Sequence, residues 1–281
     1  MLTAVGLIAA AAALARPAAP IPAAAVSAGK QASPGAAIAT LMPDPGGVIA
    51  FGELHQTRAT ANVRSAISRF TDEILPVVAP HASHLIVETW ITRGDCGEAE
   101  AHVTEEVART TERPVETESE IMKLLRRAKE LGVAPHVLDI GCDEYKVLAG
   151  QGGTAGSVDY DKLLTITNTH LERAIGQGLL LPRASGRPLV IVYGGALHND
   201  LHPDPSLAKY TFGRHVHAAT RGAYREVDLY VPEMVDSTPA LKAEPWYRAW
   251  QRAGAGASDV IIQRSARSAI VVFRRGKADK K

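Results

Sequence analysis

Cysteine, aromatic residues and an excess of charge of either sign are all scarce in this chain, and each scarcity excludes a class of protein. Only two of the 281 residues are cysteine, too few for a cysteine-rich zinc site. Phe, Trp and Tyr together make up 5% of the chain, and the formal net charge is +1. Because no basic stripe interleaved with aromatic residues is present, nucleic-acid binding is not expected.

Three familiar motifs are also missing. The sequence has no Gly-x-Ser-x-Gly, so a serine hydrolase built on a nucleophile elbow is disfavoured. It has no Gly-rich phosphate loop ending in Lys-Ser or Lys-Thr. No Gly-x-Gly-x-x-Gly opens a helix after the first predicted strand, which disfavours a dinucleotide cofactor.

The N-terminus is apolar and then rich in Ala and Pro. The run Met1–Ala15 is shorter than the roughly 20 residues of a membrane-spanning helix, and small-x-small sites follow at 13–15 and 26–28. This pattern predicts a signal peptide over 1–28, a linker over 29–44 and an exported protein, periplasmic or secreted, with no stable membrane span once the signal is removed. The first residues carry no Lys or Arg, so a low-complexity tail is the alternative.

The two cysteines, Cys96 and Cys142, each follow a predicted strand. In an oxidising compartment an even pair is read as one disulfide. Two unrelated thiols are the other interpretation, and the sequence leaves both open.

The rest of the chain predicts one α/β domain over 45–275 and a basic tail over 276–281. Nearly continuous apolar strands joined by amphipathic helices are typical of a mostly parallel sheet covered on both faces, a three-layer α/β/α fold. Two strands separated by only a few residues predict an antiparallel hairpin at one edge. The expected strands are 48–51, 84–88, 135–140, 188–193, 226–231, 259–263 and 269–273; the expected helices are 58–78, 98–109, 116–131 and 160–175.

Polar residues cluster just after three of the apolar strands. Glu53 and His55 follow the first strand, Glu88 ends the second, and His198 follows the fourth. Ligands of open α/β sheets bind beyond the carboxyl ends of the strands, so these four side chains are expected to share one catalytic and metal-binding site. Imidazole and carboxylate donors suit Mn, Fe, Co, Ni or Zn, and a donor outside the coordination shell can act as general base.

Further residues are candidates for holding a substrate. Arg58 and Arg93 each follow a strand-end motif, and either could bind an anionic group or pair with a neighbouring carboxylate instead. Asn199 and His202 follow the second histidine motif and could line the pocket. Asp139 is a further candidate, as a third carboxylate or as a group that orients a ligand histidine.

The motif Gly-x-x-His occurs twice, at 52–55 and 195–198, with the strand-end Glu88 between the two copies. Over residues 45–275 this arrangement resembles the superfamily that joins ChaN-like haem-uptake proteins, Tiki/TraB proteases and erythromycin esterases. The Tiki branch implies metal-dependent proteolysis, and the esterase branch implies hydrolysis with a histidine acting on water. The ChaN-like branch implies binding of haem or iron.

We therefore expect an exported, metal-assisted hydrolase that cleaves an ester or amide bond in a small molecule or peptide. The alternatives are a haem- or iron-binding protein without turnover and a degenerate binding module on the same fold. The sequence leaves open the substrate, the identity of the metal, and which of the four residues is a ligand and which a base.

Overall fold

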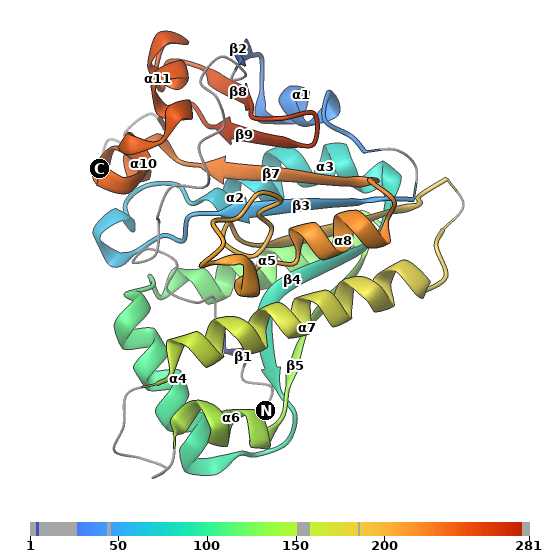
Figure 1. Cartoon of the computed structure of the whole chain (residues 1–281), viewed down its shortest axis with the longest axis vertical. Coiled ribbons are helices and arrows are strands. Elements are labelled where there is room, and N and C mark those ends of the chain that lie inside the picture. The colour runs from blue at the N-terminus through green and yellow to red at the C-terminus, as the bar shows by residue number, and fades with distance from the viewer. Residues whose placement is uncertain (1–3, 6–26, 44–45, 151–157, 185, 277–281) are drawn as a thin grey trace.

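The computed structural model describes residues 4–5, 27–43, 46–150, 158–184 and 186–276, and its core is a nine-stranded sheet (Figure 1). The strand order is β1-β4-β6-β3-β7-β9-β8-β2, and β5 pairs with β4 outside this path. The strands are β1 Ala4–Val5, β2 Ser27–Gln31, β3 Val48–Glu53, β4 Ala82–Thr92, β5 Ala134–Ile140, β6 Leu189–Gly195, β7 Tyr224–Tyr230, β8 Asp259–Gln263 and β9 Ser268–Val272.

The centre of the sheet is parallel and its margins are antiparallel. β3 pairs in parallel with β6 and β7, β4 with β5 and β6, and β7 with β9. β8 runs antiparallel to both β9 and β2, and β1 runs antiparallel to β4. The predicted α/β fold, with its parallel sheet and C-terminal hairpin at one edge, is therefore confirmed.

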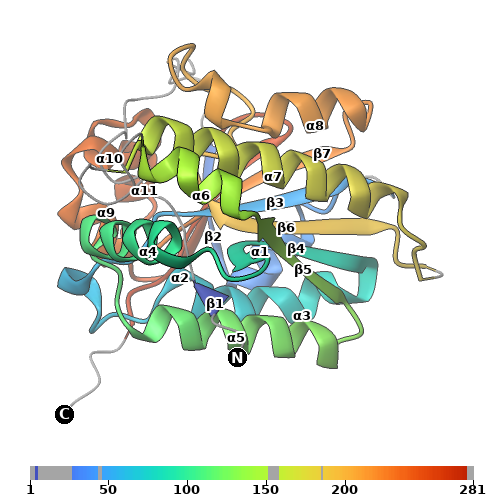
Figure 2. The same ribbon diagram turned by 90° about the horizontal axis from the view of Figure 1, so that it is seen from below.

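Helices cover both faces of the sheet, as the view from below shows (Figure 2). α6, α7 and α8 lie on one side of the sheet, and α1, α2, α3 and α5 lie on the other. The α-helices are α1 Pro34–Ala39, α2 Ala66–Arg69, α3 Leu75–Val78, α4 Gly97–Thr111, α5 Glu116–Glu130, α6 Cys142–Ala149, α7 Tyr160–Leu180, α8 Gly213–Ala219, α9 Pro232–Ser237, α10 Pro239–Ala243 and α11 Pro245–Arg252.

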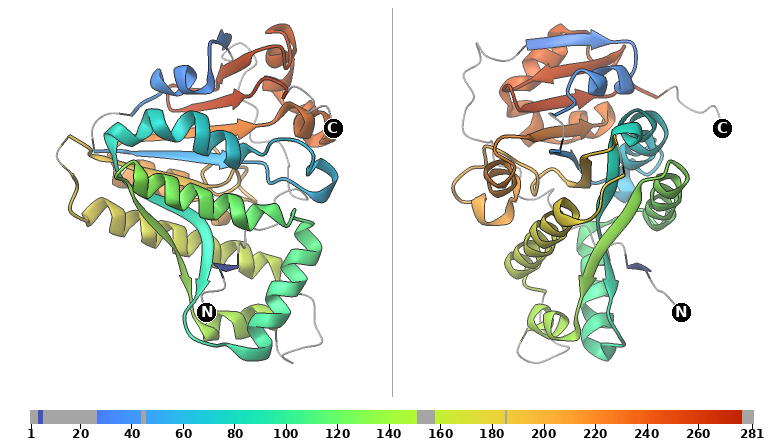
Figure 3. Two further views of the ribbon diagram at one scale, coloured as in Figure 1. Left: turned by 180° about the vertical axis from the view of Figure 1, so that it is seen from behind. Right: turned by 90° about the vertical axis from the view of Figure 1, so that its right-hand side faces the viewer.

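Side chains alternate between the two faces along each strand, so a hydrophobic core forms on each side of the sheet. In β3, Ile49 and Phe51 pack into the core shared with α1, α2, α3 and α5. Val48 and Ala50 point the other way, into the core shared with α4, α6, α7 and α8. A third cluster packs α9, α10 and α11 against the outer strands, which lie together at one end of the molecule (Figure 3). Both faces of β3 are thus buried, so its carboxyl end is held rigidly.

The helix predicted over 58–78 is wrong in its first part. Residues 58–60 form a short 3-10 turn, and helix begins only at Ala66, where the Ser65 hydroxyl caps it by accepting from the Ser68 amide at 3.0 Å. The helix then passes through a π-helical segment, Phe70–Ile74, before α3. Pro76 explains this irregularity, because proline cannot donate to the preceding turn and its ring crowds that turn's carbonyl.

The predicted linker needs a correction too. Within residues 29–44, β2 adds a strand to the sheet edge and α1 buries Ala37 and Ile38 completely. Most of the predicted signal peptide and all but the first residue of the predicted tail lie outside the described residues. None of the helices in the described ranges is both long and apolar enough to span a membrane.

Cys96 and Cys142 form a disulfide, with their Cα atoms 4.9 Å apart. It joins the segment after β4 to the first turn of α6. The disulfide interpretation is therefore the one that the structure supports.

Candidate functional site

Three neighbouring strands bring the predicted site residues to one edge of the sheet. β6 lies between β3 and β4, with Glu53 opposite Gly195 and Val87 opposite Tyr193. The ends of these strands therefore meet, and the turn after β6 returns His198 to the same place. The four predicted side chains are all buried: Glu53 is 5% exposed, His55 9%, Glu88 0% and His198 2%.

His55 is fixed by a carboxylate. Its Nδ1 lies 2.9 Å from Oε1 of Glu53, whose other oxygen, Oε2, accepts a hydrogen bond from the Tyr193 hydroxyl. Both oxygens of Glu53 are therefore engaged, and in its ionised form the carboxylate can only accept, which leaves the proton of His55 on Nδ1. The Nε2 lone pair of His55 is then free to act as a ligand or base.

His198 is fixed in the same orientation by a different group. Its Nδ1 lies 2.7 Å from the backbone carbonyl oxygen of Tyr210. A carbonyl can only accept a hydrogen bond, so Nδ1 carries a proton, and the lone pair of the neutral form of the ring is therefore on Nε2. Both histidines thus present Nε2 as their available nitrogen.

Glu88 has one oxygen held and one left over. Oε2 accepts the backbone N–H of Gly195 at 2.7 Å, whereas Oε1 is buried without a hydrogen-bond partner in the described part of the chain. Oε1 lies 3.6 Å from Nε2 of His198, too far for a hydrogen bond. An unpartnered carboxylate oxygen beside an imidazole lone pair is costly to bury.

Two glycines make room for this arrangement. A Cβ on Gly195 would lie 2.7 Å from Nε2 of His55 and 3.6 Å from Oε2 of Glu88. A Cβ on Gly52 would lie 2.6 Å from Cα of Ala196, so the turn after β6 can press against β3 only because Gly52 has no side chain. In both Gly-x-x-His motifs the first position is therefore glycine for a steric reason, since a Cβ there would be too close to neighbouring atoms.

Arg113 is a site residue that the sequence analysis missed. It lies between α4 and α5, and its guanidinium acts electrostatically on Glu53, Glu88 and Tyr193. Its Nε and Nη2 are buried without a hydrogen-bond partner among the described residues. No motif surrounds Arg113 in the sequence. Its segment is tied to the chain after β3 by a backbone hydrogen bond, in which the Glu112 carbonyl accepts from the Arg58 amide at 2.7 Å.

Burial dominates the electrostatics of the site. It raises the pKa of Glu53 to about 7, against the Tyr193 hydrogen bond and the charge of Arg113. Burial also holds the pKa of His55 well below its usual value, with Arg113 acting in the same direction, so His55 is neutral at pH 7. For the same reason burial lowers the pKa of Arg113, to about 10, which leaves it charged. The site therefore combines a neutral imidazole base with a fixed cation.

The other predicted residues have different partners. Arg93 and Asp139 form an exposed ion pair with each other, away from the centre of the site. The Asn199 amide donates to Asp228 Oδ1 at 3.2 Å and supports the turn that carries His198. Arg58 and His202 are both exposed. The four strand-end residues are thus brought together, and within the described ranges no hydrogen bond or ion pair joins these substrate-binding candidates to them.

A metal ion fits the donor chemistry of the site only in part. His198 Nε2 and Glu88 Oε1 are separated by 3.6 Å. Two ligands about 2.1 Å from a tetrahedral ion lie about 3.4 Å apart. In the described ranges, however, no group of three or more His, Cys, Asp or Glu side chains is placed so that it could hold a metal ion. Glu53 in particular has both oxygens engaged, so of the four predicted residues His55 is the remaining donor.

Comparison with known proteins adds no family to this description. No family model matches the chain, and neither the curated proteins nor the solved structures yielded a match.

Proposed function

We propose that this protein is a hydrolase that cleaves an ester or amide bond with a water molecule activated between His55, His198 and Glu88. One observation carries the proposal: two imidazoles at one edge of the sheet are each fixed through Nδ1, and Nε2 of His198 lies 3.6 Å from an oxygen of Glu88 that has no hydrogen-bond partner among the described residues. Such a group of lone pairs can take a proton from water, and it has no evident structural purpose.

The chain's own residues divide the work of such a reaction. His55 takes the proton of the attacking water on Nε2, while Glu53 accepts from Nδ1 and stabilises the imidazolium that forms. Tyr193 holds Glu53 in place through Oε2. Arg113 supplies unpartnered N–H groups that can stabilise the negative charge on the carbonyl oxygen as it is attacked.

Glu88 and His198 are the residues that would hold a divalent metal ion. His55 would then be either the third ligand or the base, because its single Nε2 lone pair cannot do both. Such an ion, when bound, would acidify water and polarise the carbonyl. The donor set does not select among Mn, Fe, Co and Zn. Export of the protein belongs to the same proposal, because the disulfide fits an oxidising compartment.

The test combines metal analysis with a substrate screen. We would measure metal content by plasma mass spectrometry after incubation with Mn, Co and Zn, and hydrolysis of a panel of chromogenic esters and peptides. His55→Ala and His198→Ala are the site variants. His202→Ala, an exposed histidine on the same loop as His198, is the matched control.

We expect hydrolysis by the wild type and the control, and a loss of at least about 100-fold in both site variants. Metal retained by the control and lost by both variants would support the metal-assisted form. Activity without metal would support histidine catalysis alone. Bound iron with a strong visible absorbance band and no hydrolysis would overturn the proposal in favour of a haem- or iron-binding protein.

A further inference from the structure

A cavity of about 860 Å³ lies apart from the candidate centre and is lined by charged side chains. Its volume is within the range of sites that hold small molecules. None of Glu53, His55, Glu88 or His198 lines it. Its charged lining residues are Arg64, Arg69, Glu73, Glu233, Arg274 and Arg275.

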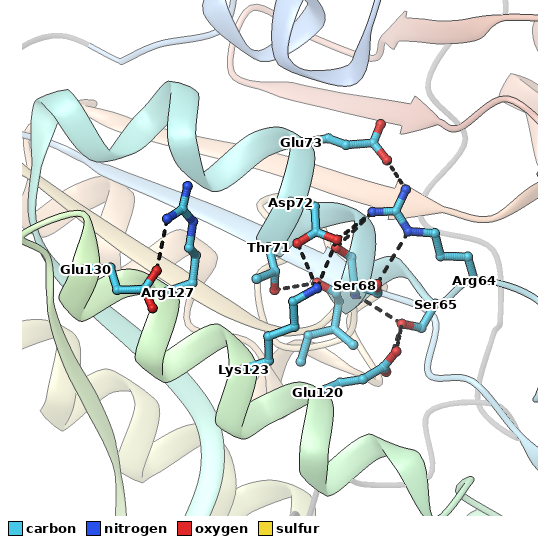
Figure 4. A network of polar contacts seen from close by, with 11 residues as sticks. Arg64, Ser65, Ser68, Thr71, Asp72, Glu73, Glu120, Lys123, Arg127 and Glu130 are labelled. Atoms are coloured by element: carbon cyan, nitrogen blue, oxygen red, sulfur yellow. Dashed lines mark hydrogen bonds and ion pairs between the residues drawn. The ribbon is translucent and has the colours of Figure 1, made fainter.

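Most of these charges have partners nearby. Arg64 pairs with Asp72 and Glu73, and Lys123 from α5 shares Asp72; Figure 4 shows this network from close by. Arg275 pairs with Asp236. These contacts neutralise one another and leave little charge for a ligand.

Arg274 is the next guanidinium of the lining. Its Nε lies 3.8 Å from Oδ2 of Asp259, and its backbone amide donates to Oδ1 of the same carboxylate at 2.8 Å. Arg274 therefore also has a counter-ion.

Arg69 is the exception among the arginines. It is 4% exposed and its guanidinium lies 5.0 Å from the centre of the Phe273 ring. Of its nitrogens only Nη1 donates a hydrogen bond within the described residues, to the Arg274 carbonyl oxygen at 2.9 Å. Nε is buried without a partner. A buried cation without a carboxylate at contact distance is costly, and a bound anionic group would remove that cost.

Glu233, at the start of α9, is the exception among the carboxylates. Its Oε1 forms a long ion pair with Nη1 of Arg275, at 3.9 Å, whereas its Oε2 is buried without a hydrogen-bond partner among the described residues. Arg69 and Glu233 influence each other electrostatically but form no ion pair among the described contacts. The walls of one cavity therefore contain one cation, Arg69, and one anion, Glu233, each with a buried side-chain atom that has no hydrogen-bond partner among the described residues.

We propose that this cavity binds a small zwitterion, a free amino acid or a short peptide, whose carboxylate is held by Arg69 and whose ammonium group is held by Glu233. A simple anion would pair with Arg69 but would leave Oε2 of Glu233 without a hydrogen bond. The Glu233 carboxylate would also repel that anion. A simple amine would pair with Glu233 but would leave the Arg69 guanidinium without an anionic partner. Only a ligand with both charges satisfies both side chains.

The experiment is a binding assay by calorimetry on the full chain. The probes are glycine, leucine, glutamate, lysine and glycylglycine, with acetate and methylamine as single-charge controls. The variants are Arg69→Gln and Glu233→Gln. Arg127→Gln, which removes a surface ion pair with Glu130 on α5, is the control (Figure 4). Circular dichroism checks that each variant is folded, and Arg69→Lys replaces Arg69→Gln if the latter is not.

We expect at least one zwitterion to bind the wild type and the control more tightly than acetate or methylamine. Each site variant should weaken that binding by about tenfold or more. A comparison of amino acids with glycylglycine then distinguishes a free amino acid from a peptide. The proposal is overturned if no zwitterion binds, if acetate binds as tightly, or if Glu233→Gln strengthens binding.

Discussion

Nε2 of His198 and Oε1 of Glu88 face each other at 3.6 Å, buried and without a hydrogen bond between them. The other end of each group is fixed, since Nδ1 of His198 contacts the Tyr210 carbonyl and Oε2 of Glu88 accepts from Gly195. Neither group can turn away to find a partner. The pair is thus held ready for a proton, a water molecule or a metal ion.

Glu88→Gln tests this relationship directly. The amide carbonyl can still accept from the Gly195 N–H, so the variant should fold with its unfolding midpoint changed little. The group facing His198 becomes an amide donor, which cannot act as a base or bind a metal. We expect a loss of at least about 100-fold in hydrolysis and loss of any bound metal. Unchanged activity in a folded variant would remove Glu88 from the site.

Glu53→Gln should act through His55 rather than on the substrate. The amide can still contact Nδ1 of His55 and the Tyr193 hydroxyl, but it cannot stabilise an imidazolium by charge. Loss of such a supporting group typically costs about 10–100-fold in activity or metal affinity. Kinetics and metal titration of the variant check this. Tyr193→Phe, which removes only the hydroxyl, should give a smaller loss, and a larger loss would contradict the assigned order.

Arg113→Gln should separate activity from stability. The guanidinium stabilises charge in the proposed reaction, so we expect kcat to fall by about 100-fold or more. The same change removes a buried cation whose Nε and Nη2 have no partner, so the melting temperature should stay the same or rise. Kinetics and thermal unfolding measure the two effects. A fall in both stability and activity would indicate a structural role instead.

Glu226 should make stability depend on pH. Burial raises its pKa from 4.5 to about 8, with the nearby Asp228 carboxylate acting in the same direction and Arg264 opposing. The folded state therefore binds a proton that the unfolded state releases. This stabilisation is complete below about pH 4.5 and is lost as the pH rises through about 8.

Urea unfolding at pH 5.5, 7 and 8.5 checks the prediction for Glu226. The free energy of unfolding should fall with rising pH by up to about 1.4 kcal/mol per pH unit from this one group. In Glu226→Gln the fall should be smaller, because Gln does not titrate. The variant should fold, since Gln can still accept the Leu201 N–H that Glu226 accepts at 3.0 Å. Equal slopes in both proteins would show that Glu226 is ionised throughout.

The disulfide should contribute to stability but not to the chemistry. Cys96 and Cys142 are 46 residues apart, and a cross-link of that span stabilises by up to about 4 kcal/mol in the chain-entropy model. A Cys96→Ser, Cys142→Ser double variant should lower the free energy of unfolding towards that amount and keep its activity. Reductant should destabilise the wild type alone; equal sensitivity in the double variant would contradict the assignment.

The sequence located the strand ends that carry the four predicted site residues, because the apolar pattern of a strand is a local property. Apolar runs identified β3, β4 and β6, and their carboxyl ends had to meet if the strands were neighbours. The helix start at 58 was wrong because the same apolar spacing occurs in the loop before Ala66. The linker was wrong because Ala- and Pro-rich composition does not exclude an edge strand or a short buried helix.

The sequence by itself therefore determined the α/β layers and the four residues at the sheet edge, since both follow from the order of apolar and polar residues along the chain. Only the tertiary structure decided which groups each of the four side chains contacts. Glu53 supports His55 because Tyr193 and His55 occupy its two oxygens, and Glu88 keeps a free oxygen because Gly195 takes only one. Arg113, Arg69 and Glu233 became visible only in three dimensions, because an unpartnered charge is defined by its surroundings and not by its neighbours in sequence.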